Sequence, residues 1–174
     1  LLNDVAVATM ALLDEGAVAR VLVLDLDVHQ GNGTAVIFAA DARVFTLSFH
    51  QERNYPSVKP PSDLDVGLAD RTGDAEYMAL LREHLPAVLE RFHPDLTFYL
   101  AGADPYREDQ LGGLCLSVEG LRDRDAYVFD TLRSAGVGVA VTLAGGYAIR
   151  EADTVRIHTT TVEEAARALT RPPA

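Results

Sequence analysis

Two aspartates and a histidine alternate along one short stretch of this sequence. Asp25, Asp27 and His29 begin inside the apolar run Val21–Leu26 and continue past its end. Alternate side chains of an extended strand point to the same face, so we expect the two carboxylates and the imidazole to lie together. Carboxylate oxygens and imidazole nitrogens bind divalent metals in proteins. The spacing therefore predicts part of a metal site.

Polar residues also follow two later apolar runs. Asp104 comes shortly after the run 96–101, and Gly145–Tyr147 comes after the run 137–143. If the runs are neighbouring parallel strands, these residues meet at one edge of the sheet. Asp27, His29 and Asp104 would then form a ligand set that leaves positions open for water and substrate, as catalytic zinc requires. Packing such carboxylates together without a cation would be costly.

Apolar runs typical of strands alternate along the chain with stretches typical of helices. This order favours an α/β fold with an open parallel sheet and helices on both faces, which binds ligands beyond the carboxyl ends of its strands. A capping box at Thr161–Glu164 predicts the start of a last helix, and the Pro-rich stretch 50–73 is expected to be a loop. The predicted strands are 21–26, 44–49, 96–101 and 137–143, and the other predicted helices are 2–15, 34–40, 74–92 and 117–135.

Composition narrows the classes of function. The chain of 174 residues has a formal net charge of -11, with 26 acidic and 15 basic residues, and its Lys and Arg residues form no stripe that could follow a phosphate backbone. We expect no nucleic-acid partner. Cys115 is the single cysteine, and no apolar run approaches the roughly 20 residues that span a bilayer. Without a recognisable signal peptide, a cytoplasmic protein that binds no membrane is expected.

Each residue has an ordinary alternative explanation when it is taken alone. A single aspartate after a strand usually caps a helix or a turn, and Tyr147 alone would be a half-buried packing residue. A phosphatase of the haloacid dehalogenase kind would need Thr or Val in place of His29 and a later catalytic lysine, but the only lysine is Lys59 in the Pro-rich loop. A dinucleotide-binding turn at 31–34 lacks its third glycine.

Five motifs follow one another along the chain: Asp25–Thr34, Thr46–His50, Ala101–Asp104, Leu111–Gly113 and Gly145–Tyr147. In order and spacing they resemble the histone deacetylase family, from residue 1 to about residue 158. Gln30, Asn32 and the stretch 109–113 are similar to the class IV enzymes and their bacterial relatives.

The resemblance implies a fold and a set of site residues. The fold is the three-layer α/β/α arginase/deacetylase fold, and residues 1–174 would be the C-terminal half of one deacetylase domain, whose N-terminal part is missing. The resemblance implies that Tyr147 donates a hydrogen bond to the oxyanion. The other implied residues are Asp27, His29 and Asp104 for zinc, Asp25 and Ser48 for a structural potassium ion, and Tyr55, Gly145 and Gly146 for the substrate.

The implied reaction is hydrolysis of an N-acyl amide, on lysine in a protein or on a small acylated amine. Acetylpolyamine amidohydrolases and acetoin-utilisation-type deacetylases are the alternatives within the fold, whereas the two-manganese arginases need further ligands. The family's paired histidines, one of them the general base, precede the position of Leu1. We therefore expect the fragment to be inactive by itself. From a different class, a non-catalytic truncated remnant acting as a binding module stays open.

Overall fold

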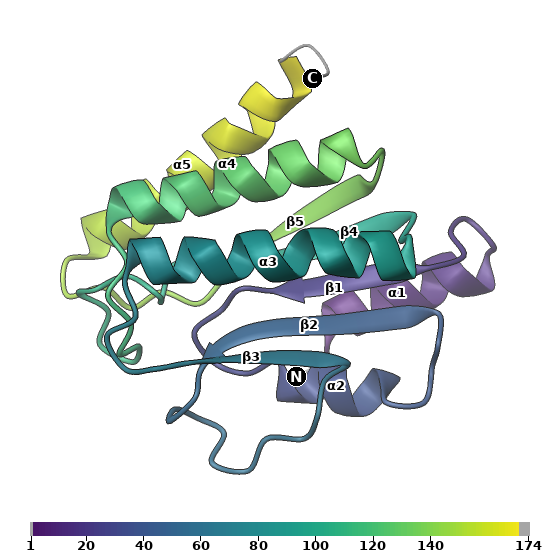
Figure 1. Ribbon diagram of the computed structural model, residues 1–174, viewed down its shortest axis with the longest axis horizontal. Coiled ribbons are helices and arrows are strands. Elements are labelled where there is room, and N and C mark those ends of the chain that lie inside the picture. Colours follow the sequence, from purple (N-terminus) through teal and green to yellow (C-terminus); the bar gives the residue numbers. More distant parts are fainter. Residues whose placement is uncertain (1, 171–174) are drawn as a thin grey trace.

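The computed structural model describes residues 2–170, which form a five-stranded parallel sheet between two layers of helices (Figure 1). The strand order is β3-β2-β1-β4-β5, and all four pairings are parallel. The strands are β1 (Val21–Asp25), β2 (Val44–Gln51), β3 (Leu64–Leu68), β4 (Leu96–Gly102) and β5 (Gly138–Ala144). The helices are α1 (Asp4–Asp14), α2 (Asn32–Phe38), α3 (Asp74–Phe92), α4 (Val118–Ser134) and α5 (Glu151–Thr170).

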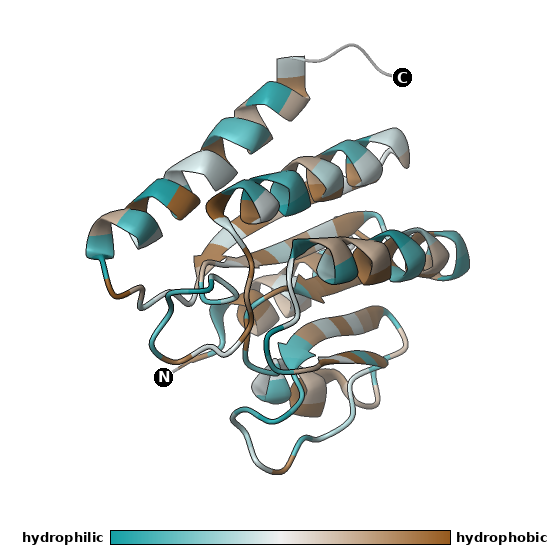
Figure 2. Ribbon diagram, turned by 60° about the vertical axis from the view of Figure 1, so that its left-hand side comes forward, coloured by the Kyte–Doolittle hydropathy of each residue, from teal (hydrophilic) through white to brown (hydrophobic). Residues whose placement is uncertain are grey.

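Both faces of the sheet are covered, which explains why the strands read as continuous apolar runs. Along β1, Leu22 and Leu24 pack into the core shared with α3, α4 and α5, whereas Val21 and Val23 pack into the core shared with α1 and α2. In Figure 2 hydrophobic residues concentrate in the strands, and the helices alternate between hydrophobic and hydrophilic residues. The predicted three-layer α/β/α fold is confirmed.

The helix starts follow ordinary capping chemistry. The Asn3 side chain accepts a hydrogen bond from the Ala6 N–H, and the Ser117 side chain accepts one from the Gly120 N–H. The helices predicted at 2–15, 34–40, 74–92 and 117–135 are all present, with ends shifted by a few residues at most. No helix within residues 2–170 has both the length and the apolar character needed to cross a membrane.

The structure corrects two predictions. The stretch 50–73 is not all loop, because Leu64–Leu68 pairs with β2 as the strand β3. Only Val66 and Leu68 of this edge strand are buried. Asp65 and Gly67 are residues typical of loops, and for this reason the composition of the segment indicated a loop. The capping box was also wrong, since α5 begins ten residues earlier, at Glu151.

Thr161 lies in the middle of α5, where its hydroxyl has tertiary partners instead of capping the helix. It donates to Asp125 on α4 and also contacts the Ile157 carbonyl one turn earlier. Glu164 binds Arg122 and Arg167. Side chains that satisfy a capping pattern can therefore be occupied by packing between helices.

Candidate metal centre and active site

The predicted site residues gather at the carboxyl edge of the sheet. The chain runs from β1 to β2 and β3 on one side, then returns to β4 and β5 on the other side of β1. The adjacent ends of β1 and β4 are therefore the switch point at which open α/β sheets bind ligands. Asp25 ends β1, Gly102 ends β4, and Gly145 follows the end of β5.

Asp27, His29 and Asp104 bring their side chains together at this point. One potential ligand atom from each lies within 4.8 Å of the others. His29 Nδ1 is 3.0 Å from Asp27 Oδ1 and 3.5 Å from Asp104 Oδ2. Asp104 is nearly inaccessible to solvent, with 2% of its surface exposed, whereas Asp27 and His29 are half-buried. The structure thus places the three predicted ligands as one cluster that is open on one side.

Backbone hydrogen bonds fix the orientation of the two carboxylates. Asp104 Oδ1 accepts the Val28 N–H at 2.9 Å, and this bond links the segment after β4 to the segment after β1. Asp27 Oδ1 accepts the His29 N–H at 2.8 Å. One oxygen of each carboxylate is therefore held by the backbone, while Oδ2 of each is directed toward the position of Gly145.

The cluster carries more negative charge than its protein neighbours neutralise. Burial raises the pKa of Asp104 to about 6, with the charge of Asp27 adding to the effect and the hydrogen bond from His29 opposing it. Hydrogen bonds first to Asp104 and then to Asp27 raise the pKa of His29 to about 10. Burial, followed by the charge of Asp27, raises the pKa of Asp25 well above its usual value. Carboxylates that share a buried site show such raised pKa values, because burial and a neighbouring negative charge both disfavour the ionised form.

Glycine is required beside the cluster. A methyl group placed on Gly145 would collide with the Asp104 and Asp27 carboxylates. Gly146 has φ 143°, a backbone conformation that L side chains rarely adopt. The Gly145 carbonyl also accepts the Ala103 N–H at 3.0 Å, which extends the β4–β5 pairing to the site. The end of β5 therefore passes close to the carboxylates, and the substrate role of the two glycines stays a prediction.

Tyr147 directly follows the two glycines beside the cluster. Its side chain is 63% exposed, while its backbone is held on both sides. The Tyr147 N–H donates to Asp109 Oδ2 at 2.6 Å. The Tyr147 carbonyl accepts the backbone and side-chain N–H groups of Gln110, both at 3.0 Å. The loop 105–116 thus positions the Gly-Gly-Tyr segment, a role that the sequence pattern at 109–113 did not reveal.

Asp25 and Ser48 are cross-strand neighbours beneath the cluster. They face each other in the β1–β2 register, and both are buried. Asp25 Oδ1 accepts the Asp27 N–H at 3.1 Å. Ser48 Oγ lies 3.1 Å from His50 Nδ1. The two predicted potassium ligands are therefore brought together.

Tyr55 is placed differently from the other predicted residues. It lies 70% exposed on the loop between β2 and β3. Lys59 Nζ donates to the carbonyls of Asn54 and Pro56 at 2.7 Å each, and the Asn54 side chain donates to the Leu111 carbonyl at 2.9 Å. The loop that carries Tyr55 is thus attached to the loop 105–116.

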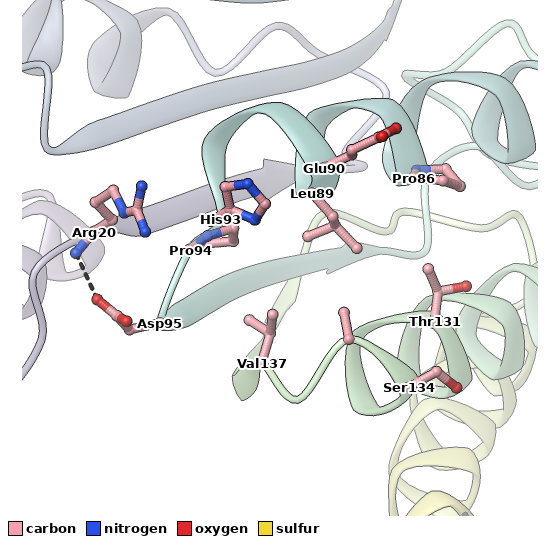
Figure 3. A pocket seen from close by; sticks show the side chains of 11 residues that line it. Arg20, Pro86, Leu89, Glu90, His93, Pro94, Asp95, Thr131, Ser134 and Val137 are labelled. Atoms are coloured by element: carbon pink, nitrogen blue, oxygen red, sulfur yellow. Dashed lines mark hydrogen bonds between the residues drawn. The ribbon is translucent and has the colours of Figure 1, made fainter. Parts of the chain in front are cut away.

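A hollow lies at the opposite, amino edge of the sheet (Figure 3). Its volume is about 610 Å³, and its lining includes Arg20, Leu89, His93, Asp95 and Val137. Figure 3 shows these side chains spread around the hollow, with the Arg20 N–H bonded to Asp95. Among residues 2–170, the group that could hold a metal lies only at the carboxyl edge. Chemistry, and not volume, locates the candidate site there.

Comparisons with known proteins agree with this arrangement. The model of the histone deacetylase domain matches residues 1–162. An uncharacterized protein of Picosynechococcus sp. is 46% identical over 158 residues, which cover 91% of this chain and 53% of that protein. A probable deacetylase of Methanothermobacter thermautotrophicus is 33% identical over 163 residues, which cover 83% of this chain and 46% of that protein. The chain therefore spans about half the length of these relatives.

A solved structure resembles nearly the whole fold. The structure of the histone deacetylase Clr3 superimposes with a TM-score of 0.78 at 26% sequence identity, covering 99% of this chain and 31% of the Clr3 chain. The likeness includes the parallel sheet whose strand ends carry the cluster.

Proposed function

This chain belongs to the histone deacetylase family, and from that premise we propose that it supplies the metal-binding part of a zinc-dependent hydrolase of N-acyl amides. The observation that carries the proposal is the convergence of Asp27, His29 and Asp104 within 4.8 Å at the carboxyl edge of the sheet. A deacetylase-type hydrolase is what the family supports. The zinc, the roles of the residues and the substrate are our inferences.

The donor set fits a catalytic zinc ion. Two carboxylates and one imidazole are zinc ligands, and three protein ligands leave a position for water or substrate. Burial and the charge of Asp27 raise the pKa of the Asp104 carboxyl, so a divalent ion held here would relieve the repulsion between the two carboxylates. When bound there, zinc would polarise the amide carbonyl and lower the pKa of a water molecule. We assign Asp25 and Ser48 to a potassium ion next to it.

The remaining roles belong to residues around the cluster. The Tyr147 hydroxyl would donate a hydrogen bond to the amide carbonyl oxygen as negative charge develops on it, which is the stabilisation that acyl-transfer enzymes use most. Gly145 and Gly146 would let the substrate approach the cluster, because Gly145 presents no side chain beside the carboxylates and Gly146 takes a backbone conformation that L side chains rarely adopt. Tyr55 would form one wall of the path taken by the acylated amine.

The proton acceptor for the attacking water is proposed to come from outside this chain. His50 is buried next to Ser48, and His84 packs against the Phe49 ring. His93 lies at the hollow on the opposite edge of the sheet. His158 has a buried Nδ1 with no hydrogen-bond partner among the described residues. None of these four is among the possible ligands of the cluster, and the resemblance places the general-base histidines outside residues 1–174. We therefore infer that residues 1–174 alone turn over almost no substrate.

The exposed edge of β5 supports the view that these residues are the C-terminal half of one domain. β5 is the last strand of the described sheet, and its residues are half-buried or exposed although the strand is apolar. The hollow lined by Val139, Val141, Ala165, Ala168 and Leu169 lies beside it. We propose that further strands of the same domain cover this side in the complete protein.

The decisive experiment compares the full-length protein with residues 1–174 alone. Each is purified, its zinc content is measured, and hydrolysis of an acetyl-lysine peptide and of an acetylated polyamine is followed before and after chelation. The expected result is zinc-dependent release of acetate by the full-length protein and near-background release by residues 1–174. Full-length protein that binds zinc but hydrolyses neither substrate would support a binding module. Hydrolysis that survives complete zinc removal would contradict the proposal.

A further inference from the structure

A charged residue lies in the core directly below the metal-binding cluster. Arg124, in the first half of α4, has 0% of its surface exposed. It lies on the inner face of α4, between the sheet and α5, and its guanidinium reaches the strand ends. Arginine is almost never fully buried unless it is paired, so its position requires an explanation.

The Arg124 guanidinium bridges the two strands that carry the predicted ligands. The backbone pairing of β1 with β4 extends to a hydrogen bond from the Leu26 N–H to the Leu100 carbonyl at 3.1 Å. Beyond it, Arg124 Nη1 donates to the Gly102 carbonyl at 2.8 Å and to the Leu26 carbonyl at 3.4 Å. Leu26 immediately precedes Asp27, and Gly102 stands two residues before Asp104. The Arg124 side chain thus connects β1 and β4 beyond the point where their backbone hydrogen bonds end.

Asp125 holds the guanidinium in place and is itself fully bonded. Arg124 Nε donates to Asp125 Oδ1 at 2.9 Å. The Tyr99 hydroxyl donates to the same oxygen at 2.5 Å, and the Thr161 hydroxyl donates to Oδ2 at 2.5 Å. Since Tyr99 is on β4 and Thr161 is on α5, the ion pair is fixed from three elements. Its geometry is therefore rigid.

Stability alone does not explain this ion pair. Desolvating two charges costs several kcal/mol per ion, and apolar replacements of buried ion pairs are often neutral or stabilising. An apolar residue at position 124 could fill the space but could not bond two carbonyls. Gly102 also lies so close to Asp27 that a methyl group on it would be 2.6 Å from the Asp27 Cα. The spacing of the two strand ends is therefore tightly set.

We infer that Arg124, held by Asp125, is a positioning residue that sets the spacing between Asp27 and Asp104 for a divalent metal ion. It acts through the Leu26 and Gly102 carbonyls and does not touch the metal ligands themselves. The inference rests on the proposed function, since it assumes that the cluster binds metal. Partners that orient metal ligands typically change metal affinity about 10–100-fold when they are removed.

The test measures binding of Zn²⁺ and Co²⁺ to the full-length protein and its variants. Arg124→Lys keeps the buried charge opposite Asp125 but offers a shorter side chain without the planar fork. Arg124→Met combined with Asp125→Asn removes both charges and keeps an acceptor for Tyr99, so it does not leave a buried charge unpaired. The matched control is Arg122→Lys, because Arg122 lies on the same helix and pairs with Glu164 at 2.7 Å, away from the strand ends.

We expect both Arg124 variants to bind Zn²⁺ about 10-fold or more weakly, with altered visible absorption of bound Co²⁺, while circular dichroism and thermal unfolding stay close to those of the parent. The Arg122→Lys control should bind like the parent. Parent-like metal affinity and Co²⁺ absorption in both folded Arg124 variants would overturn this inference alone. If the parent itself binds neither metal, the proposed function fails and this inference fails with it.

Discussion

The amino and carboxyl edges of the sheet each carry an aspartate that accepts backbone hydrogen bonds. The pKa values of these two aspartates are nevertheless shifted in opposite directions. At the amino edge, Asp95 Oδ2 accepts the N–H groups of Ala19 and Arg20, each at 2.8 Å, and these bonds lower the pKa of Asp95. At the carboxyl edge, burial raises the pKa of Asp104 to about 6 even though Val28 and His29 donate to it.

The difference indicates that carboxylate charge at the carboxyl edge is incompletely neutralised by neighbouring residues. Asp95 is exposed and joins the segment before β1 to the start of β4, so it is a structural residue beside a large hollow. Asp104 is buried next to a second carboxylate. A metal ion would be stabilised only at the carboxyl edge. Carboxylates that are crowded and incompletely neutralised are therefore a better guide to function here than the size of a cavity.

The largest expected effect comes from changing one aspartate at each edge. Asp104→Asn in the full-length protein keeps an acceptor for the Val28 N–H but removes the charge, and it should weaken zinc binding by more than about 100-fold, beyond the cost of losing an indirect partner. Deacetylation should fall to background. Asp95→Asn is the matched control and should leave both unchanged. Zinc affinity is measured by calorimetry. Equal affinity in the two variants would contradict the claim that Asp104 binds zinc and Asp95 does not.

Tyr147→Phe separates the metal site from the residue proposed to act on the substrate. Loss of one hydrogen-bond donor to a developing oxyanion costs about 100–1,000-fold in kcat. We expect that loss in the full-length protein with little change in KM or in zinc affinity. Steady-state kinetics and zinc content together measure it. A variant with parent-like kcat would show that the exposed tyrosine is not catalytic.

Two glycines at opposite ends of β5 differ in what a side chain would meet there. A methyl group at Gly145 would collide with the Asp104 and Asp27 carboxylates, whereas one at Gly138 would meet ordinary contacts of 3.4 Å to the Asp95 carbonyl and 3.5 Å to a Leu96 side chain. Gly145→Ala should weaken zinc binding by about 10-fold or more, the effect of displacing ligands. Gly138→Ala should bind zinc normally. The prediction fails if Gly145→Ala also binds normally.

The smallest expected effect concerns the amino edge and pH. Because Asp95 has a lowered pKa in the folded state, it stabilises the fold above its unfolded pKa, and this stability is lost as the pH falls through the lower folded value. Asp95→Ala should therefore reduce the free energy of unfolding near neutral pH by at most about 1 kcal/mol, since the group is exposed. Urea titrations should show the difference shrinking below pH 3.8. A constant difference would assign it to packing.

Sequence reasoning succeeded where local patterns decide the outcome. Val21–Asp25 and Asp74–Phe92 agree closely with the predicted strand and helix, because buried parallel strands and amphipathic helices have distinct apolar spacings. The convergence of Asp27, His29 and Asp104 followed from strand ends that meet at one edge. Their binding of zinc stays a prediction.

The remaining features depend on contacts between distant segments. β3 is a half-exposed edge strand, and its pairing with β2 supplies what its composition does not indicate. Arg124 has the position of an ordinary charged residue on an amphipathic helix, and only the folded arrangement reveals its contacts with Leu26 and Gly102. Asp109 likewise becomes informative once its bond to the Tyr147 N–H is known. Periodicity carries no information on such long-range bonds.

The open edge of β5 has a practical consequence for work on residues 1–174. The strand Gly138–Ala144 contains no charged residue and no proline, and its outer backbone groups face no neighbouring strand in the described sheet. Exposed, uncharged, β-branched edges of this kind recruit other strands and promote aggregation. We expect the isolated chain to self-associate at high concentration, and a lysine introduced at Leu143, which is 54% exposed, should act as a gatekeeper that keeps it monomeric.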